Sequence, residues 1–343
     1  MINRGIINRG GSDLKEISFP FSYINVDIYG RCNLRCKFCL EGQRLNEQPA
    51  LQMPFSSFRQ WIGPILPGLR QLEIFNWTEP FYHKELFEIL DWTAVQNPNL
   101  ALRLSTNGTL INREIAERLV SSPVQVLTIT MAGLTQEDYS YYHGVDSLER
   151  VIHSLQALAA AKKDLGSSTP RIRLRYLRFS FNLVSSARVR RWLKKHLGSN
   201  ASFIDSASVR EGYLCGSGLS EEEIEKVYQI DPKGGSLISI PYYPYCQKNP
   251  SSPAVRADGA VFPCCNLPYR DEYIMGFLGK ATFQEIWEGP SYSRFRESFI
   301  EGKEIVCKNC FIRIPRVPLK LDRSLIQRMH FRWRINRFKR SIL

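Results

Sequence analysis

An alternation of strand-like and helix-like segments is the feature that most constrains the fold of this chain. Residues 23–28 alternate polar and apolar side chains among β-branched and aromatic residues, which predicts a strand. The expected strands are 23–28, 71–75, 102–105, 124–130 and 171–181, and the expected helices are 56–66, 84–96, 113–120, 148–163 and 187–197. About six strand–helix units fit before residue 220. The sequence therefore predicts an α/β fold with a parallel sheet, closed or partly closed, and fewer units than the roughly eight of a full barrel.

The length and composition of the chain are those of a globular protein. Its 343 residues allow two domains, or one large domain with an appendage. Hydrophobic residues make up 43% and charged residues 23%, which excludes wholesale disorder. No apolar run approaches the roughly 18 residues of a membrane-spanning helix, and the N-terminus has no apolar signal-peptide core. We therefore expect a cytoplasmic protein whose nine cysteines are reduced rather than paired.

Changes in composition along the chain predict the domain boundaries. Residues 1–20 are expected to form a flexible leader, and residues 21–235 contain the strand–helix units of the barrel. Residues 241–313 combine short elements, many turn residues and five cysteines, a pattern typical of a small metal-stapled module. Residues 314–343 form a basic tail.

The tail carries most of the excess positive charge. The formal net charge is +13, and residues 316–343 contribute nine basic residues against one acidic residue. Apolar residues recur there at every fourth position, at Leu321, Leu325, Met329 and Trp333. This pattern predicts a basic amphipathic helix for an anionic membrane surface or an acidic partner, and the membrane case would make the protein peripheral. The alternative is a helix packed on the barrel with solvated charges. We do not expect a nucleic acid partner, because no nucleic-acid-binding fold is recognised.

Cys32, Cys36 and Cys39 form a C-x3-C-x2-C loop directly after the first expected strand. Thiolates are soft ligands that select iron–sulfur clusters or zinc. Structural zinc takes four protein ligands, and this loop offers three with no histidine or fourth cysteine nearby. Three ligands to a four-iron cluster leave one iron open to a small molecule. The alternative is a zinc site that takes its fourth ligand from elsewhere.

This loop resembles that of the radical S-adenosylmethionine (SAM) superfamily, which also has an aromatic residue before the last cysteine. Three further segments resemble family motifs and follow in the same order: Asn76–Pro80 its Gly-Gly-Glu-Pro motif, Ser105–Gly108 its Thr-Asn-Gly motif, and Thr130–Gly133 its Ser-x-Asp-Gly segment. Each ends an expected strand, where barrel enzymes carry their chemistry. Two positions depart from the family pattern: Thr78 replaces a glycine and Ala132 replaces an aspartate.

The resemblance implies a partial, TIM-like (β/α)6 barrel with one four-iron four-sulfur (4Fe-4S) cluster on the three cysteines. SAM would bind its open iron and be cleaved reductively to a 5′-deoxyadenosyl radical, which takes a hydrogen atom from the substrate. The implied cofactor-binding residues are Phe38 at the adenine, Glu79 with the adjoining Pro80 at the methionine ammonium, and Asn107, Thr130 and Asn182 at the ribose or carboxylate. Asn107, Thr130 and Asn182 could instead be ordinary turn or strand-end residues.

Four later cysteines form a second set of candidate ligands. They are Cys246, Cys264, Cys307 and Cys310. Residues 255–263 between them predict a β-hairpin with an Asp-Gly turn. The set resembles the twitch or short SPASM module of some radical SAM enzymes, which implies one auxiliary 4Fe-4S cluster. Structural zinc is the alternative that the spacing permits. Cys264 is favoured over Cys265 as the ligand because Pro-Cys after the hairpin is the family's form.

The number of cysteines favours one class of function within the family. Two four-cysteine auxiliary sites would need more than the five cysteines after residue 240, so one auxiliary cluster is expected. Such enzymes oxidise or epimerise a carbinol of a sugar, aminocyclitol or nucleotide-sugar, with the auxiliary cluster as electron relay and a flavodoxin or ferredoxin as electron donor. The alternatives are a peptide-modifying maturase of ribosomal peptides and a non-catalytic iron–sulfur or zinc protein.

Two further features concern the substrate. Cys215 could return a hydrogen atom during epimerisation, and the plainer interpretation is a small buried hydrophobic residue. Four basic residues could bind a phosphate, nucleotide or carboxylate, or simply lie in solvent. They are Arg31, Arg35, Lys37 and Arg178.

Overall fold

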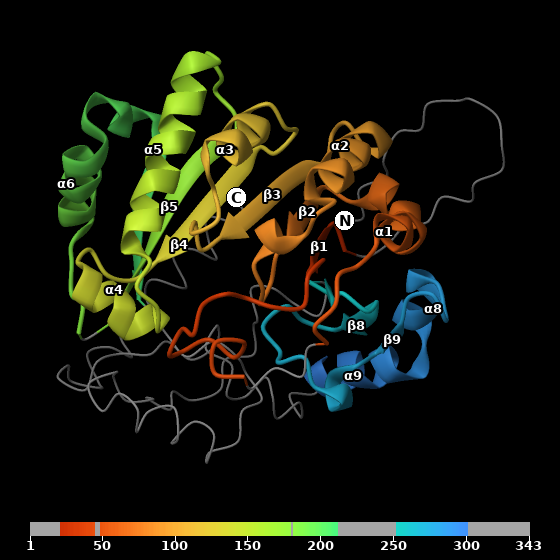
Figure 1. The fold of residues 1–343 in the computed structure, drawn as a ribbon. Helices are drawn as coiled ribbons and strands as arrows, with labels where there is room; N and C mark the ends of the chain where they lie inside the picture. Colours follow the sequence, from red (N-terminus) through yellow and green to blue (C-terminus); the bar gives the residue numbers. More distant parts are fainter. Residues whose placement is uncertain (1–20, 45–48, 180, 212–251, 301–343) are drawn as a thin grey trace, which may run out of the picture.

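Six parallel strands form the centre of the molecule, and helices cover one face of their sheet (Figure 1). The computed structural model describes residues 21–44, 49–179, 181–211 and 252–300. The strands are β1 (Tyr23–Val26), β2 (Gln71–Ile74), β3 (Ala101–Thr106), β4 (Val126–Met131), β5 (Arg171–Arg178) and β6 (Ser206–Glu211). Each pairs in parallel with the next strand of the sequence. This confirms the expected α/β fold with six strand units, and β6 is an edge strand of the described sheet.

Each strand from β1 to β5 is followed by at least one helix, as the sequence pattern predicted. The α-helices are α1 (Phe55–Ile62), α2 (Leu86–Gln96), α3 (Arg113–Val120), α4 (Gln136–His143), α5 (Leu148–Asp164) and α6 (Ser186–Leu197). Asn112, Thr135 and Ser185 begin α3, α4 and α6, and each side chain accepts a hydrogen bond from a first-turn N–H. Such caps satisfy donors that have no partner within the helix, so they set where these helices start.

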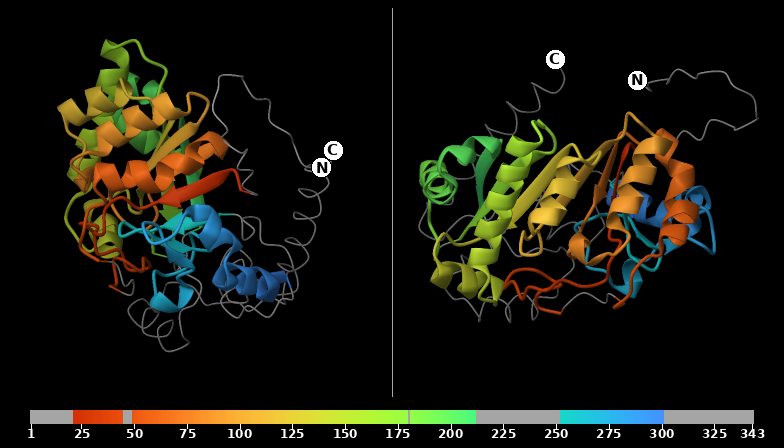
Figure 2. Two further views of the ribbon diagram at one scale, coloured as in Figure 1. Left: turned by 90° about the vertical axis from the view of Figure 1, so that its right-hand side faces the viewer. Right: turned by 45° about the horizontal axis from the view of Figure 1, so that its top comes forward.

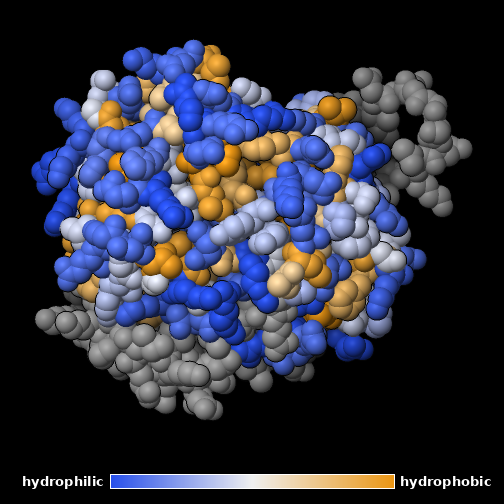
Figure 3. All heavy atoms as spheres, in the orientation of Figure 1, coloured by the Kyte–Doolittle hydropathy of each residue, from blue (hydrophilic) through white to orange (hydrophobic). Residues whose placement is uncertain are grey.

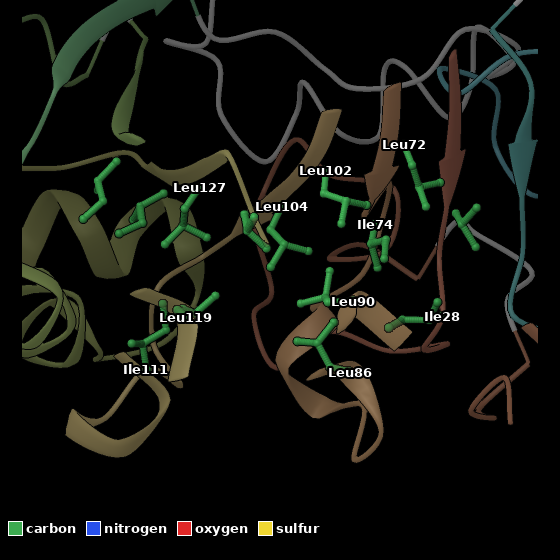
Figure 4. Close-up of a cluster of buried hydrophobic side chains, with 14 of the residues drawn as sticks. Ile28, Leu72, Ile74, Leu86, Leu90, Leu102, Leu104, Ile111, Leu119 and Leu127 are labelled. Carbon is green, nitrogen blue, oxygen red and sulfur yellow. The ribbon is translucent and has the colours of Figure 1, made fainter. Parts of the chain in front are cut away.

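The hydrophobic core lies between the sheet and the helix layer (Figure 4). Strand side chains alternate between two faces, and Leu72, Leu102 and Leu127 extend from the helix-facing side of the sheet. Leu90 of α2 and Leu119 of α3 meet them, and all five are fully buried. Burying a leucine side chain stabilises the fold by about 1.5–3 kcal/mol. The outer surface of the helix layer is mainly hydrophilic (Figure 3).

The opposite face of the sheet is polar, because every second strand residue faces away from the helices. Its residues include Tyr23, Asn25, Glu73, Arg103, Ser105, Thr128, Thr130, Arg173, Arg175 and Ser208. None of them belongs to the helix-side core, whereas their strand neighbours Ile24, Leu104 and Leu174 do. The side of the sheet away from the helices is therefore mainly polar, and its apolar residues include the buried Val126 of β4.

The later described residues continue the same sheet. Their strands are β7 (Ala254–Val255), β8 (Ala260–Phe262) and β9 (Gly276–Phe277). β7 pairs in parallel with β1, and β7 and β8 form the expected hairpin. Gly259 in its turn has a φ of 85°, which glycine adopts without strain. The helices α8 (Phe283–Glu288) and α9 (Pro290–Ile300) follow β9.

Two of the expected strands, 23–28 and 71–75, end one or two residues early, at Val26 and Ile74, and two further elements end earlier still. The helix expected over 56–66 stops at Ile62 and continues as a 3₁₀ helix, η1 (Gly63–Gly68), which contains Pro64 and Pro67. Proline lacks the N–H that an α-helix needs in its interior. The strand expected to reach residue 181 stops at Arg178, where the Asn182 side chain accepts a hydrogen bond from the Phe179 N–H.

Several expectations fall outside the described residues. They are the leader 1–20, the tail 314–343, and Cys215, Cys246, Cys307 and Cys310. Within the part of the chain that the structure describes, no helix is both long and apolar enough to cross a membrane.

Candidate active site

The three cysteines of the first motif lie on the loop after β1, beside the carboxyl ends of the strands (Figure 1). All three are partly exposed and free of disulfide bonds. The backbone N–H groups of Arg35 and Lys37 donate to the carbonyls of His143 and Tyr142, each at 2.9 Å. Two backbone hydrogen bonds therefore hold the cysteine loop against the end of α4.

The thiols suit a cluster in their chemistry. Burial and the nearby Glu79 carboxylate raise the pKa of the Cys32 thiol to about 12, so an ionised thiolate here needs a cationic partner. The Asn107 amide donates to Cys32 Sγ at 3.7 Å. The described residues contain no ready-made group of three metal-binding side chains. Three soft thiol donors on one short loop fit the three-cysteine ligation of a 4Fe-4S cluster.

His143 at the end of α4 contacts the same loop. Its Nδ1 lies 3.1 Å from Cys36 Sγ, and its Nε2 accepts a hydrogen bond from the Ala132 N–H at 3.0 Å. The ring is buried, and burial lowers the pKa of His143 to about 3. A neutral ring whose Nε2 accepts must carry its proton on Nδ1, so His143 donates to the Cys36 sulfur.

Glu79 lies at the end of the segment after β2 and is buried. Its Oε1 accepts from Thr106 Oγ1 at 2.7 Å, and its Oε2 accepts from the Asn107 N–H at 2.9 Å. Burial raises the pKa of Glu79 to about 7, and these hydrogen bonds oppose that rise. Pro80 follows at the start of the 3₁₀ helix η2 (Pro80–Tyr82) and is also buried. The carboxylate and Cys32 are thus joined through Asn107, which contacts both.

Thr78, which departs from the family's glycine, directs its hydroxyl toward Asp27 and Tyr29. Its hydroxyl lies 2.8 Å from Asp27 Oδ1 and 2.7 Å from the Tyr29 carbonyl. Asp27, at the end of β1, also accepts from the backbone N–H groups of Asn76 and Trp77. Thr78 therefore adds a hydrogen bond to a carboxylate that shapes the whole turn.

The other predicted cofactor residues have varied surroundings. Phe38 is buried, and its ring centroid lies 5.1 Å from that of Phe179. Thr130 is partly exposed and sits beside Arg175 in the sheet register. Asn182 is buried, with its amide bonded to the Leu177 carbonyl and the Phe179 N–H within its own loop. The structure brings Glu79 and Asn107 to the cysteine loop, whereas Asn182 is engaged in closing the turn after β5.

Cys264 and Cys265 have different environments in the second cysteine set. Cys264 is partly exposed, and its sulfur accepts from the Asn266 N–H at 3.5 Å and the Asn266 side-chain amide at 3.7 Å. Cys265 is buried in a cluster with Phe262 and Tyr269. Hydrogen bonds to an accessible sulfur are typical of a cluster ligand, so the surroundings favour Cys264.

Sequence reasoning missed three polar residues that organise the site: Asp27, His143 and Tyr269. The Tyr269 hydroxyl lies 3.0 Å from Asp27 Oδ2 and accepts from the Asn76 amide at 3.0 Å. Tyr269 is 242 positions from Asp27, so no local pattern links them. The signal for Asp27 was a carboxylate at the end of an alternating strand, and that for His143 a histidine ending a short helix.

Two family models match the chain. The radical SAM superfamily model matches residues 26–170, and the iron–sulfur cluster-binding SPASM domain matches residues 246–311. The first spans β1 to α5 and includes the cysteine loop, Glu79 and Asn107. The second spans the hairpin and all five late cysteines.

Relatives with named activities differ widely in chemistry. The tungsten-containing aldehyde ferredoxin oxidoreductase cofactor-modifying protein of Pyrococcus furiosus is 23% identical over 85% of this chain and 87% of its own. The AdoMet-dependent heme synthase of Methanosarcina barkeri is 23% identical over 82% and 87%. These are similarities of sequence across nearly full lengths, and they span different reactions.

Solved structures share the fold. Streptococcus suis SuiB bound to SAM has a TM-score of 0.57 at 15% identity, over 81% of this chain and 68% of that chain. BtrN in complex with AdoMet and 2-DOIA has a TM-score of 0.51 at 17% identity, over 86% and 94%. With both family models in chain order and each carried by its own cysteine set, this chain belongs to the radical SAM superfamily and has a C-terminal SPASM iron–sulfur domain.

Proposed function

We propose that this protein cleaves SAM reductively and uses the resulting radical to oxidise or epimerise a carbinol of a sugar, aminocyclitol or nucleotide-sugar. The observation that carries the SAM chemistry is the placement of the Glu79 carboxylate and the cysteine loop around Asn107. The Glu79 carboxylate, which can accept from a cationic amine, and the thiols of the cysteine loop therefore lie together at the strand ends.

The chain's own residues bind and orient the cofactor. When bound, the cluster supplies one electron to SAM, and the radical that results takes a hydrogen atom from the substrate. Glu79 is held by Thr106 and the Asn107 N–H, so it can accept from the methionine ammonium without moving. Phe38 offers an aromatic wall for the adenine, and its buried ring neighbours exclude water.

A single auxiliary cluster supports the finer assignment of substrate class. Its proposed ligands are Cys246, Cys264, Cys307 and Cys310. Oxidation of a carbinol removes one hydrogen atom, one further electron and one proton, and the second electron needs an acceptor. The auxiliary cluster would take it, and a flavodoxin or ferredoxin would reduce the first cluster. In epimerisation a thiol such as Cys215 would return the hydrogen atom instead, from the opposite face.

The test uses substrates deuterated at the carbinol carbon. The anaerobically reconstituted and reduced protein would be incubated with SAM and deuterated aminocyclitols, sugars or nucleotide-sugars. We expect deuterium in 5′-deoxyadenosine with one of them, and a ketone or an inverted carbinol as product. SAM cleavage with no deuterium transfer from any member of the series would contradict the substrate class while leaving the radical chemistry intact.

A peptide substrate is the second candidate. SuiB, which shares the fold, has also been solved bound to its precursor peptide SuiA. The mycofactocin maturase MftC of Mycobacterium ulcerans is 29% identical over 134 residues, 38% of this chain and 34% of its own. A peptide substrate would transfer deuterium from a labelled residue of a precursor peptide and leave sugar-like compounds unchanged.

A further inference from the structure

Two rows of arginine and hydroxyl side chains cross the polar face of the sheet. In the lower row, Thr128 of β4 and Ser206 of β6 are the register partners of Arg173 on β5. In the row above, Thr130 and Ser208 flank Arg175 in the same way. Neighbouring strands lie about 4.8 Å apart. Arg173 and Arg175 therefore each have a hydroxyl residue beside them on the strands to both sides.

Arg103 of β3 is a further cation on this face. It lies one strand beyond β4, with Val126 as its register partner. Its Nε is buried and has no hydrogen-bond partner. Within the described residues, neither Arg103 nor Arg173 forms an ion pair. Partly buried guanidinium groups are ordinarily paired, because removing a charge from water is costly.

The carboxylates of this face are already engaged by other donors. Glu73, the register partner of Arg103, accepts from the Tyr23 hydroxyl at 2.6 Å and the Asn25 amide at 3.1 Å. Asp27 and Glu79 accept from the turns after β2 and β3, as described above. Glu73 is thus held by donors other than Arg103, and the register partners of Arg173 are uncharged hydroxyl residues.

We propose that Arg103 and Arg173, with the hydroxyls of Thr128 and Ser206 beside Arg173, bind a phosphate group of the substrate. Guanidinium groups bind phosphate oxygens in a bidentate manner, and serine and threonine hydroxyls donate to the same oxygens. A ligand anion would supply the ion-pair partner that both arginines lack among the described residues. This inference rests on the proposed function and narrows its substrate class to phosphorylated sugars, cyclitols or nucleotide-sugars.

The experiment measures binding of inorganic pyrophosphate to the reconstituted protein by anaerobic calorimetry, with SAM present at saturation. We expect Arg173→Gln and Arg103→Gln each to weaken binding about tenfold or more, as for loss of a charge-assisted hydrogen bond. Arg173→Lys keeps the charge and loses the bidentate geometry. Its affinity for pyrophosphate should therefore lie between that of the wild type and that of Arg173→Gln. Arg190→Gln removes the same charge from the exposed side of α6 and should leave binding unchanged.

Each other outcome overturns the inference. Equal weakening in Arg190→Gln would show an effect of net charge alone. Acetate binding as tightly as pyrophosphate would replace phosphate with a carboxylate ligand, and weaker SAM affinity in Arg173→Gln would assign that arginine to SAM. Pyrophosphate binding that no arginine variant weakens, with SAM cleavage intact, would refute the phosphate site and leave the proposed function standing. Loss of SAM cleavage in the wild type would instead refute the function.

Discussion

His143 shows how one buried side chain connects two parts of the site. The Ala132 N–H fixes its tautomer, and the ring then donates to the sulfur of Cys36. A hydrogen bond to a ligand sulfur stabilises the more negative, reduced cluster and raises its potential. We therefore expect His143→Phe to shift the midpoint potential of the SAM-binding cluster to a more negative value without loss of iron. Redox titration followed by electron paramagnetic resonance would measure the shift.

Two variants serve as controls for this prediction. His143→Asn places an amide N–H near the former Nδ1 and should recover part of the potential. His83 is also buried, with its Nε2 2.7 Å from the Met53 carbonyl and no sulfur partner among the described residues. His83→Phe should therefore leave the potential unchanged even where it lowers stability. A potential that is the same in wild type and His143→Phe would contradict the hydrogen bond to Cys36.

At the scale of elements, Asp27 and Tyr269 join the strand ends of the barrel to the segment after β8. Asp27→Asn would place an amide N–H against donors from Trp77 and Tyr269, leaving buried polar groups unpaired. We expect a loss of about 3 kcal/mol in the free energy of unfolding, typical for breaking a buried charged network. Tyr269→Phe removes one donor and should cost about 1 kcal/mol. Urea denaturation would measure both, and strictly additive costs in the double variant would contradict their direct contact.

The start of α8 carries a complete capping box. The Thr282 hydroxyl accepts from the Glu285 N–H, and the Glu285 carboxylate accepts from the Thr282 N–H at 2.7 Å. Thr282→Ala should cost about 1 kcal/mol of unfolding free energy, because a first-turn donor loses its acceptor. The hydrogen bonds from Thr282 lower the pKa of Glu285 below its ordinary value of 4.5. The ionised Glu285 carboxylate therefore contributes its full stabilisation above pH 4.5, and this contribution is lost as the pH falls further. Urea denaturation of the protein at several pH values would detect the loss. If the difference in unfolding free energy between the wild type and Thr282→Ala stayed the same from above to below pH 4.5, the Glu285 contribution would be contradicted.

The elements could be predicted from sequence where periodicity and caps agree. The helix over 113–120 and the hairpin at 255–263 were placed correctly, because a local pattern and local turn residues determine them. The strand 171–181 was too long because the stop depends on Asn182 folding back to Phe179. The Asp27–Tyr269 contact could not be foreseen, since it joins residues that only the pairing of β1 with β7 brings together.

The arginine rows show a similar limit. The spacing Arg171-x-Arg173-x-Arg175 places these residues on one face of a strand, which the sequence alone could indicate. Which hydroxyls flank them depends on the register of β4, β5 and β6, and that register follows from packing of the whole sheet.

At the scale of the whole molecule, the first cysteine set follows β1 and Cys264 follows β8, and both strands belong to one continuous sheet because β7 extends it from β1. The first set lies beside Glu79 and Asn107, and Cys264 of the second is presented by the β8 side of the same sheet.

The most direct measurement is a count of iron and sulfide together with an assay of SAM cleavage after anaerobic reconstitution and reduction. The wild type should hold about eight irons per chain and release 5′-deoxyadenosine, as expected for two four-iron clusters. A Cys32/Cys36/Cys39→Ala variant should keep about four irons and release none. Zinc in place of iron, or no cleavage by a wild type that holds both clusters, would contradict radical SAM chemistry in this protein.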